Sequence, residues 1–328
     1  MADLEPTVRV ETWPLAKPFI ISRGTQTNIA VIVVEILDGH HRGRGECCPV
    51  EYFGQTVAGE QAAVLKILSQ LRRVSDWDAL HDQVPAGPAR NAVDCAIWDL
   101  RAKRSGVGIG ALFGLDPLKP VETVFTISLE SPEAMAASAL AATGHDILKL
   151  KFGAPGDVER IRAIRQAVPD KRLVVDVNEA WSRADLDAFL PAMAEAGVLM
   201  VEQPLKAGRD AELDGMARPI PLGADESCRT TADLDRVVGR YDVVNIKLDK
   251  TGGLTEAMRL STAAREQGLD TMVGCMLGTS LAMAPAMLVA QTCRFVDLDA
   301  PLLIGADRAP SLGYLDGFVH PPIPALWG

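Results

Sequence analysis

The alternation of apolar and polar residues changes character near residue 120, which indicates two structural parts. In the first part, short segments alternate with the two-residue period of half-buried strands, and Asp38-Gly39 is a hairpin signal between two of them. Apolar residues at helical spacing follow. The predicted strands are 7–13, 28–37 and 42–46, and the predicted helices are 57–73 and a segment that begins at Pro88. These patterns predict an α+β domain built on an antiparallel meander.

After Val121 the pattern becomes strand, helix, strand, helix, with a period of about 25 residues. Ser131 and Ser182 are suitable N-cap residues for two of the helices. Eight strand and helix units predict an α/β fold, namely a (β/α)8 or TIM-like barrel. The predicted strands are 122–129, 146–152, 172–178, 198–203, 221–226, 243–248, 271–275 and 294–298.

A stretch rich in glycine and proline, residues 106–120, separates the two patterns and marks a domain boundary. The tail from Pro301 contains five prolines and is expected to return to the first domain. We therefore expect an N-terminal α+β capping domain over residues 1–115, completed by the tail from about 301–328, and a catalytic barrel over residues 116–300.

Composition narrows the class of protein. The chain has 328 residues, of which 48% are hydrophobic, so one large and one smaller core are possible. A net charge of −10 argues against nucleic acid as a partner, and no apolar run reaches the roughly 18 residues of a membrane span. Scattered cysteines without a C-x-x-C pair predict reduced thiols. We expect a cytoplasmic homo-oligomer that acts on a small molecule.

Three acidic residues each end a successive predicted strand: Asp176, Glu202 and Asp225. Neighbouring strands lie about 4.8 Å apart, so the three carboxylates repel one another unless a cation joins them. Oxygen-only ligands favour Mg²⁺ over zinc. A solvated strand end or a helix N-cap explains any one of these acids, but it explains the three together poorly.

Lysines lie on both sides of the acids along the chain. Because strand side chains alternate, Lys149 and Lys151 point to the same face, and Lys247 ends a later strand. Charged groups at strand ends belong at the mouth of a barrel, where catalysis takes place. Lysines beside a cation site suit proton transfer.

The same residues carry a family resemblance that covers almost the whole chain. In order and in strand position they resemble the muconate-lactonizing subgroup of the enolase superfamily. This resemblance implies that the three acids bind Mg²⁺ and that lysines on the second and sixth strands face each other across the substrate's α-carbon. The matching motifs are Lys149-x-Lys151, Asp176-Val-Asn178, Glu202-Gln-Pro204, Asp225-Glu226-Ser227 and Asn245-x-Lys247.

Within that subgroup, the dipeptide epimerases are the most similar. The segment Ser22-Arg23-Gly24-Thr25 resembles theirs, which implies that Arg23 binds the side-chain carboxylate of a glutamate; the alternative is a surface salt bridge. Asp297 and Asp299 share one face of the eighth strand and suit a free ammonium, unless Asp297 caps a helix or pairs with Arg294. Ser128 and Met276 are candidates for the substrate pocket, with core packing as the alternative.

The resemblance also implies a mechanism. The substrate's α-proton leaves to one lysine, an enediolate forms, and the other lysine returns a proton to the opposite face. Lys151 and Lys247 are the acid-base pair, and Lys149 adds a fixed positive charge. Asp249 and Asn178 are expected to orient the groups around them.

The leading hypothesis is Mg²⁺-dependent epimerisation of the C-terminal residue of an acidic dipeptide of the L-Ala-D/L-Glu type, as in cell-wall peptide recycling. Three alternatives remain open at this point. An N-acylglutamate racemase would use the same lysines with a different pocket. An o-succinylbenzoate synthase would use them for elimination. A non-catalytic barrel would only bind an acidic ligand.

Overall fold

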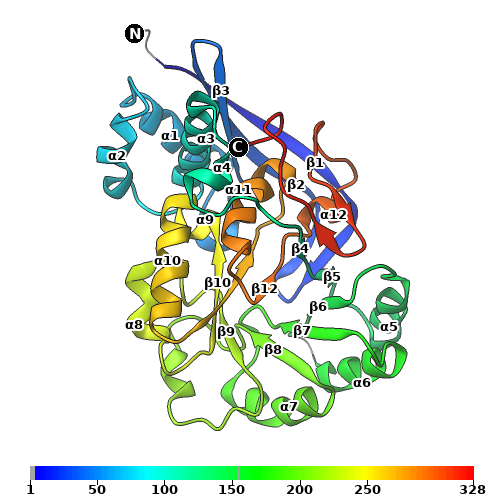
Figure 1. The fold of residues 1–328 in the computed structure, drawn as a ribbon. Helices are drawn as coiled ribbons and strands as arrows, with labels where there is room; N and C mark the ends of the chain where they lie inside the picture. The colour runs from blue at the N-terminus through cyan, green and yellow to red at the C-terminus, as the bar shows by residue number, and fades with distance from the viewer. Residues whose placement is uncertain (1–3, 154) are drawn as a thin grey trace.

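A parallel sheet of eight strands forms the centre of the computed structural model, which describes residues 4–153 and 155–328 (Figure 1). The strands follow one another in chain order and the sheet curls on itself, so that the Val124 N–H donates to the Val296 carbonyl at 2.9 Å across the two ends. The strands are β5 (Phe125–Ile127), β6 (Ile147–Lys151), β7 (Arg172–Asp176), β8 (Val198–Glu202), β9 (Leu222–Ala224), β10 (Val243–Lys247), β11 (Asp270–Gly274) and β12 (Phe295–Val296). The predicted α/β barrel is confirmed.

Helices cover the outside of this sheet, but not evenly (Figure 1). The connection from β8 to β9 contains one 3-10 turn, η3 (Asp210–Leu213), because Gly208, Gly215 and Pro219 interrupt any longer helix. The next connection has only η4 (Thr231–Asp233) and α8 (Leu234–Val237). The longer helices are α5 (Pro132–Ala141), α6 (Asp157–Ala167), α7 (Arg183–Glu195), α10 (Leu254–Glu266) and α11 (Ser280–Ala290), and two short ones are α9 (Leu248–Thr251) and α12 (Ala300–Leu303).

Alternation along the strands separates two kinds of surroundings. In β6, Leu148 and Leu150 belong to the large apolar cluster, whereas Ile147 packs with apolar residues of other strands in a separate cluster. Lys149 and Lys151 share the face of Ile147, two and four residues further on. The smaller cluster comprises Val124, Ile147, Val174, Met200, Val243, Met272 and Phe295. The barrel interior therefore has an apolar floor with charged residues above it.

The N-terminal part forms a three-stranded antiparallel sheet and a set of helices. Its strands β1 (Glu5–Ile21), β2 (Gly24–Asp38) and β3 (His41–Cys47) are longer than predicted, because a register shift between Pro14 and Phe19 lets β1 continue past the prolines. The predicted helix over 57–73 is too long, because Asp76 accepts hydrogen bonds from the backbone N–H groups of Arg72 and Arg73. The helical elements are η1 (Glu51–Phe53), α1 (Val57–Leu68), α2 (Asp76–Leu80), η2 (His81–Gln83), α3 (Pro88–Ser105) and α4 (Ile109–Leu112).

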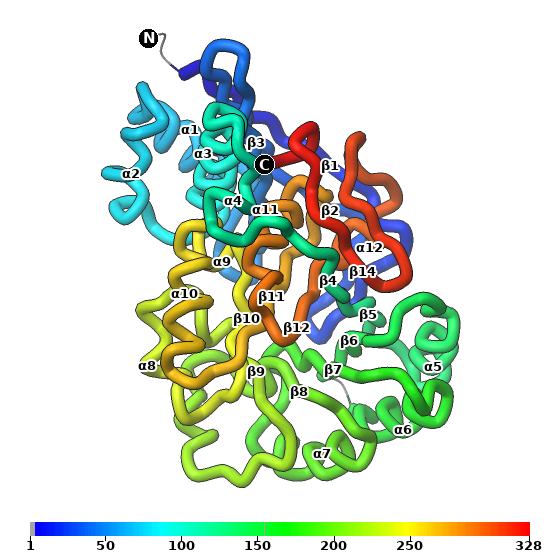
Figure 2. Tube along the Cα trace, viewed as in Figure 1, coloured from blue at the N-terminus to red at the C-terminus, as the bar shows by residue number. Residues whose placement is uncertain are grey.

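The C-terminal tail returns to the N-terminal part, and Figure 2 shows the C-terminus beside α3. The Trp327 indole donates to the Cys95 carbonyl at 3.1 Å, and the Gly328 N–H donates to Asp99 at 2.6 Å. A small sheet joins β13 (Tyr314–Leu315) and β14 (Phe318–Val319) to β4 (Val121–Glu122). The tail therefore contacts α3 of the N-terminal part and β4 at the start of the barrel part, and the predicted domain bounds stay predictions.

Two further expectations concern thiols and membranes. All six cysteines are free, in agreement with the prediction of reduced thiols. Among the described residues, no helix combines the length and the apolar character that crossing a membrane requires.

The close contact of β3 with α3 gives a stability prediction. A Cβ at Gly45 would lie 2.0 Å from the Ala92 carbonyl oxygen, whereas a Cβ at Gly108, where φ is −61°, would meet nothing within 4 Å. We expect Gly45→Ala to lower the free energy of unfolding by about 1–3 kcal/mol or more through overpacking, and Gly108→Ala to change it by less than about 0.5 kcal/mol. Denaturant unfolding of both variants checks this, and equal stabilities would contradict the packing argument.

Candidate active site

A cavity of about 760 Å³ lies where the barrel meets the capping sheet. Its wall contains most of the predicted site residues, namely Arg23, Lys149, Lys151, Lys247, Met276, Asp297 and Asp299. Ser128 is not in this wall, because its hydroxyl accepts a hydrogen bond from the Ile20 N–H at 3.3 Å and so ties β1 to the barrel. The structure thus brings the predicted lysines and acids together and leaves Ser128 as a structural contact.

Two lysines on β6 are paired with the predicted acids. The Lys149 Nζ lies 3.1 Å from an oxygen of Asp176, 2.8 Å from one of Glu202 and 2.6 Å from one of Asp297. The Lys151 Nζ lies 2.6 Å from the same Asp176 oxygen. Asp176 and Glu202 end the adjacent strands β7 and β8, and both are fully buried. Each acid is therefore held beside an ammonium group.

The third acid, Asp225, is held by two lysines on the other side of the barrel. The Lys247 Nζ lies 2.6 Å from one carboxylate oxygen of Asp225, and the Lys250 Nζ lies 2.6 Å from the other. Lys250 also donates to the carbonyls of Cys228 and Asn245. The Asn245 amide donates to Glu202 at 2.6 Å, which fixes the middle acid.

Burial and opposite charge compete at these groups. Burial disfavours the charged form of Asp176 and Asp225, but the neighbouring lysines outweigh it and lower the pKa of both carboxyl groups. Burial likewise disfavours the Lys149 and Lys247 ammonium groups, but the surrounding carboxylates raise the pKa of both amines. At Glu202, burial and the negative charge of Asp176 raise the pKa. With the acids paired in this way, Lys149 and Lys247 are held as ammonium ions.

The chemistry of the acids fits a hard divalent cation. One oxygen of Glu202 and one of Asp225 are buried and have no hydrogen-bond partner, although ammonium groups lie near them. The three acids offer oxygen ligands only, from three adjacent strands. Their oxygens do not all lie within 4.8 Å of one another, because Lys149 bridges Asp176 and Glu202 while Lys247 and Lys250 hold Asp225.

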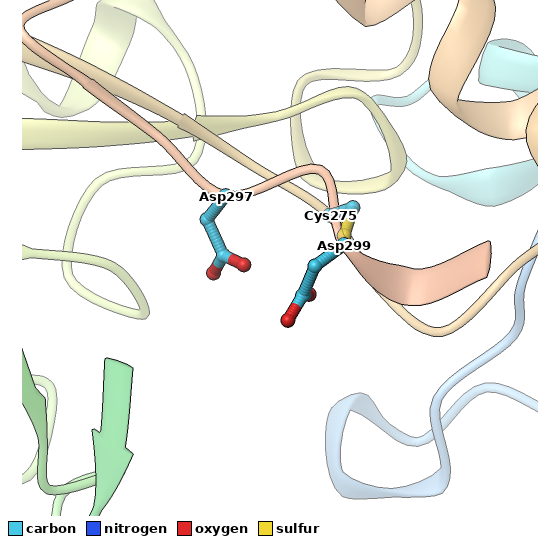
Figure 3. Close-up of side chains that lie close together, drawn as sticks. All are labelled: Cys275, Asp297 and Asp299. Carbon is cyan, nitrogen blue, oxygen red and sulfur yellow. The ribbon is translucent and has the colours of Figure 1, made fainter. Parts of the chain in front are cut away.

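A second acidic group lies on the wall of the cavity. Among the described residues, one set of three possible ligand atoms lies within 4.8 Å, on Cys275, Asp297 and Asp299. Figure 3 shows the two carboxylates pointing the same way, with the Cys275 sulfur next to Asp299, and all three residues line the cavity. Burial and the charge of Asp297 raise the pKa of Asp299 to about 7, and its carboxylate accepts from the Thr126 N–H. This concentration of negative charge suits a small cation.

Arg23 lies in the turn between β1 and β2, at the cavity wall. One terminal nitrogen lies 2.8 Å from Glu226 and the other 3.1 Å from Glu179, so it forms the ion pairs of the alternative prediction. The guanidinium also stacks over the ring of Tyr52 at 4.1 Å. Only 27% of the side chain is exposed, so Arg23 is both a salt-bridge residue and a wall of the site.

Sequence reasoning missed Lys250, Glu179 and Tyr52. Lys250 had a signal, since it follows Lys247 by three residues and one helical turn, α9, returns it to the same acid. Glu179 has a left-handed backbone with φ of 67°, and Tyr52 lies in a 3-10 turn, so neither belongs to a periodic pattern. Their contacts arise only from tertiary packing.

The expectation for Asp249 is wrong, whereas that for Asn178 agrees with the structure. The Asn178 N–H donates to Asp176 at 2.9 Å. Asp249 instead accepts from the Asn91 amide at 2.8 Å and the Cys48 N–H at 3.3 Å, because α9 turns its side chain toward the capping helices. It therefore joins the two parts of the chain.

Comparison with known proteins identifies the family. Residues 4–114 match the N-terminal domain of the mandelate racemase and muconate lactonizing enzyme family, and residues 133–321 match the enolase C-terminal domain-like family. The chain belongs to the enolase superfamily. Within the superfamily its relatives are epimerases and racemases, which makes it an isomerase.

Two relatives and two solved structures define its place in the superfamily. The chain is 43% identical to the L-Ala-D/L-Glu epimerase of Escherichia coli, over 96% of this chain and 99% of that one. It is 41% identical to an N-acetyl-D-glutamate racemase of a Pseudoalteromonas species, over 91% and 95%. It also resembles two solved structures closely.

The first is an enolase family member from Agrobacterium tumefaciens with homology to dipeptide epimerases, with bound sodium and L-Ala-L-Glu. Its TM-score is 0.95 at 43% identity, over 99% of this chain and 100% of that one. The second is a dipeptide epimerase from Enterococcus faecalis V583 complexed with Mg and L-Leu-L-Tyr. Its TM-score is 0.90 at 27% identity, over 98% of both chains.

The buried carboxyl group of Asp249 gives a pH prediction. Burial raises its pKa to about 7, so the folded chain keeps a proton that the unfolded chain loses above about pH 4. This group therefore makes stability fall as the pH rises toward 7. We compare the free energy of unfolding of Asp249→Asn with that of the original chain. We expect this difference to shift in favour of the variant by about 2–3 kcal/mol between pH 5 and pH 8.

Denaturant unfolding at both pH values checks this prediction. Asp170→Asn is the control, since Asp170 is exposed and should leave the pH dependence unchanged. A constant difference between Asp249→Asn and the original chain would show that Asp249 is ionised in the fold.

Proposed function

We propose that this isomerase epimerises the C-terminal residue of acidic dipeptides, of the L-Ala-D/L-Glu type, by proton transfer between two lysines. The observation that carries the proposal is the placement of Lys151 and Lys247. Lys151 ends β6 and Lys247 ends β10, and these strands are four places apart in the order of the eight-stranded sheet. Both lysines line the same cavity. Two acid-base groups on opposite sides of a substrate are what inversion of a carbon centre requires.

The two lysines divide the reaction between them. One takes the α-proton as a neutral amine, so that the C–H bond breaks and its electron pair passes into the adjacent carboxylate as an enediolate. The other, as an ammonium, gives a proton to the opposite face, and a new C–H bond forms. The lysines thereby exchange protonation states, and proton exchange with solvent must restore them before another substrate of the same configuration can react. Lys149, fully buried beside them, keeps a positive charge near the developing negative charge.

The ion pairs between the lysines and the acids create a requirement for catalysis. The carboxylates around Lys247 raise its pKa against the effect of burial, and an amine held as ammonium in this way cannot accept a proton. A divalent cation at Asp176, Glu202 and Asp225 would take over these carboxylates and lower the pKa of the lysines. We assign this role to Mg²⁺, which would also stabilise negative charge on the substrate carboxylate as a Lewis acid. The oxygen-only ligands and the Mg in the Enterococcus relative support the assignment.

The substrate is assigned from the remaining charges. Asp297 and Asp299 suit the free ammonium of a dipeptide, while Arg23 suits the carboxylate of a glutamate side chain. Met276 lines the same cavity and would contact the substrate. The L-Ala-L-Glu in the Agrobacterium structure and the activity of the Escherichia coli relative support this choice. Cell-wall peptide recycling, a cytoplasmic location and a homo-oligomeric state accompany it as predictions.

The rival function is racemisation of an N-acylglutamate, which the Pseudoalteromonas relative favours. An N-acyl substrate carries no ammonium, so it would leave the charges of Asp297 and Asp299 without a partner beyond Lys149. An o-succinylbenzoate synthase, which eliminates water, would not need proton transfer on two faces. A dipeptide therefore fits the charges of the cavity better.

Isotope exchange tests the two lysines. We expect Lys151→Ala and Lys247→Ala each to abolish epimerisation in Mg²⁺ and D₂O, because each removes one of two required groups. Each variant should still exchange the α-proton of one epimer of L-Ala-Glu, and the two variants should favour opposite epimers. Mass spectrometry and chiral separation give both readouts, with EDTA-treated protein as the metal-free control. Normal epimerisation by Lys247→Ala would refute the two-lysine mechanism.

A substrate comparison decides between dipeptide and N-acyl chemistry. We expect the original chain to turn over L-Ala-Glu faster than N-acetyl-glutamate. Asp297→Asn should lower kcat/KM for L-Ala-Glu by a factor that corresponds to on the order of 2–3 kcal/mol of transition-state stabilisation, because the substrate ammonium loses its partner. The same substitution should lower kcat/KM for N-acetyl-glutamate much less. Faster racemisation of N-acetyl-glutamate than of any dipeptide would replace the proposed function with the racemase.

A further inference from the structure

Arg23 is fixed by residues from both parts of the chain. Its guanidinium stacks over the ring of Tyr52, at 4.1 Å, and one terminal nitrogen lies 3.1 Å from a carboxylate oxygen of Glu179. The Tyr52 hydroxyl donates to the same Glu179 oxygen. Tyr52 belongs to η1 of the capping part, whereas Glu179 follows β7 of the barrel. The three side chains therefore form a closed triangle across the wall of the cavity.

Glu179 is the fixed corner of this triangle. Its side chain is 5% exposed, and its other carboxylate oxygen accepts from the Ala207 N–H at 2.7 Å. Its own N–H donates to the Gln203 carbonyl at 2.8 Å, with a left-handed backbone at φ of 67°. Such a backbone costs energy for a residue other than glycine and persists only where the surroundings hold it. The carboxylate is thus anchored by contacts within the chain itself.

We propose that Tyr52 is a specificity-determining residue, which holds Arg23 in place for an acidic substrate side chain through its ring and through its hydroxyl on Glu179. The inference rests on the proposed function, since it names how that site selects its substrate. Arg23 already has two acidic partners, Glu179 and Glu226, on its terminal nitrogens. Without support from Tyr52, the guanidinium is free to turn fully onto these acids and away from the cavity.

The contacts predict a graded effect on selectivity. Ring stacking and the hydrogen bond each contribute to holding the guanidinium, so losing both should cost more than losing the hydrogen bond alone. Tyr52→Phe removes the hydroxyl and keeps the ring, and Tyr52→Leu removes both. Tyr52 is 45% exposed, so neither change opens a cavity in the core. A role confined to folding would lower turnover of all substrates alike.

The test compares L-Ala-L-Glu with L-Ala-L-Gln, which has the same shape but an uncharged side chain. We expect the ratio of their kcat/KM values to fall about threefold in Tyr52→Phe and about tenfold in Tyr52→Leu. In the Glu179→Asn background, where asparagine tolerates the left-handed backbone but its shorter side chain is drawn back from Tyr52, Tyr52→Phe should change the ratio no further. Additive losses would show that the hydroxyl does not act through Glu179.

A neighbouring residue provides the matched control. Phe53 lies in the same 3-10 turn, and its ring carries the guanidinium of Arg229 at 4.9 Å. Phe53→Leu loosens the turn and removes an edge contact with the Tyr52 ring at 5.3 Å, but it keeps the ring that stacks on Arg23 and the hydroxyl that donates to Glu179. We expect it to leave the Glu-to-Gln ratio unchanged. A ratio in Tyr52→Leu equal to that of the original chain, or an equal fall in Phe53→Leu, would overturn the proposal.

Calorimetric binding separates this proposal from the proposed function. If the original chain binds L-Ala-L-Glu but does not epimerise it, the proposed function fails, and the ratio of Kd values for the two dipeptides tests Tyr52 instead. If it epimerises L-Ala-L-Glu and Tyr52→Leu keeps the ratio, only the inference about Tyr52 fails. A chain that neither binds nor epimerises L-Ala-L-Glu overturns both.

Discussion

The mutual neutralisation of buried lysines and acids is the interaction on which the active site depends. Transferring an isolated ion out of water costs several kcal/mol, so charges remain in a folded interior only with partners. Lys149, bound to three acids at once, is the centre of this arrangement. Beneath it, Val174 and Met200 close the floor of the barrel to water. The strands can therefore present ions at one end because they bury apolar side chains at the other.

The same neutralisation would also control when the site is reactive. Under the proposed function, the acids have two possible partners, the lysines or a metal ion. While lysines satisfy the acids, the amines hold their protons; when a cation does so, they are released for proton transfer. The same carboxylates would then determine both the stability of the fold and the protonation state of the catalytic lysines. Asp176, which contacts both Lys149 and Lys151, is where these two demands meet most directly.

The parts of the site that lie on strands could be predicted from the sequence, because the two-residue period fixes which face a side chain occupies. Lys149, Lys151 and Asp176 are examples. Ser128 was misplaced because β5 ends at Ile127, so the next residue leaves the inner face. The position of Tyr52 could not be predicted, since it depends on how one loop docks on another. Irregular backbone carries no periodic signal, and long-range contacts decide it.

The return of the tail to α3 has a consequence for biosynthesis. The helix α3 is synthesised before the barrel, yet it receives contacts from Trp327 and Gly328, which follow the whole barrel in the sequence. Domains generally acquire structure in the order of their synthesis, but this one is completed by a segment made after the barrel. During translation, part of the surface of α3 therefore stays uncovered while the barrel is being made. In a nascent chain the region of Cys95 and Asp99 therefore lacks these partners until residues 327 and 328 have been made.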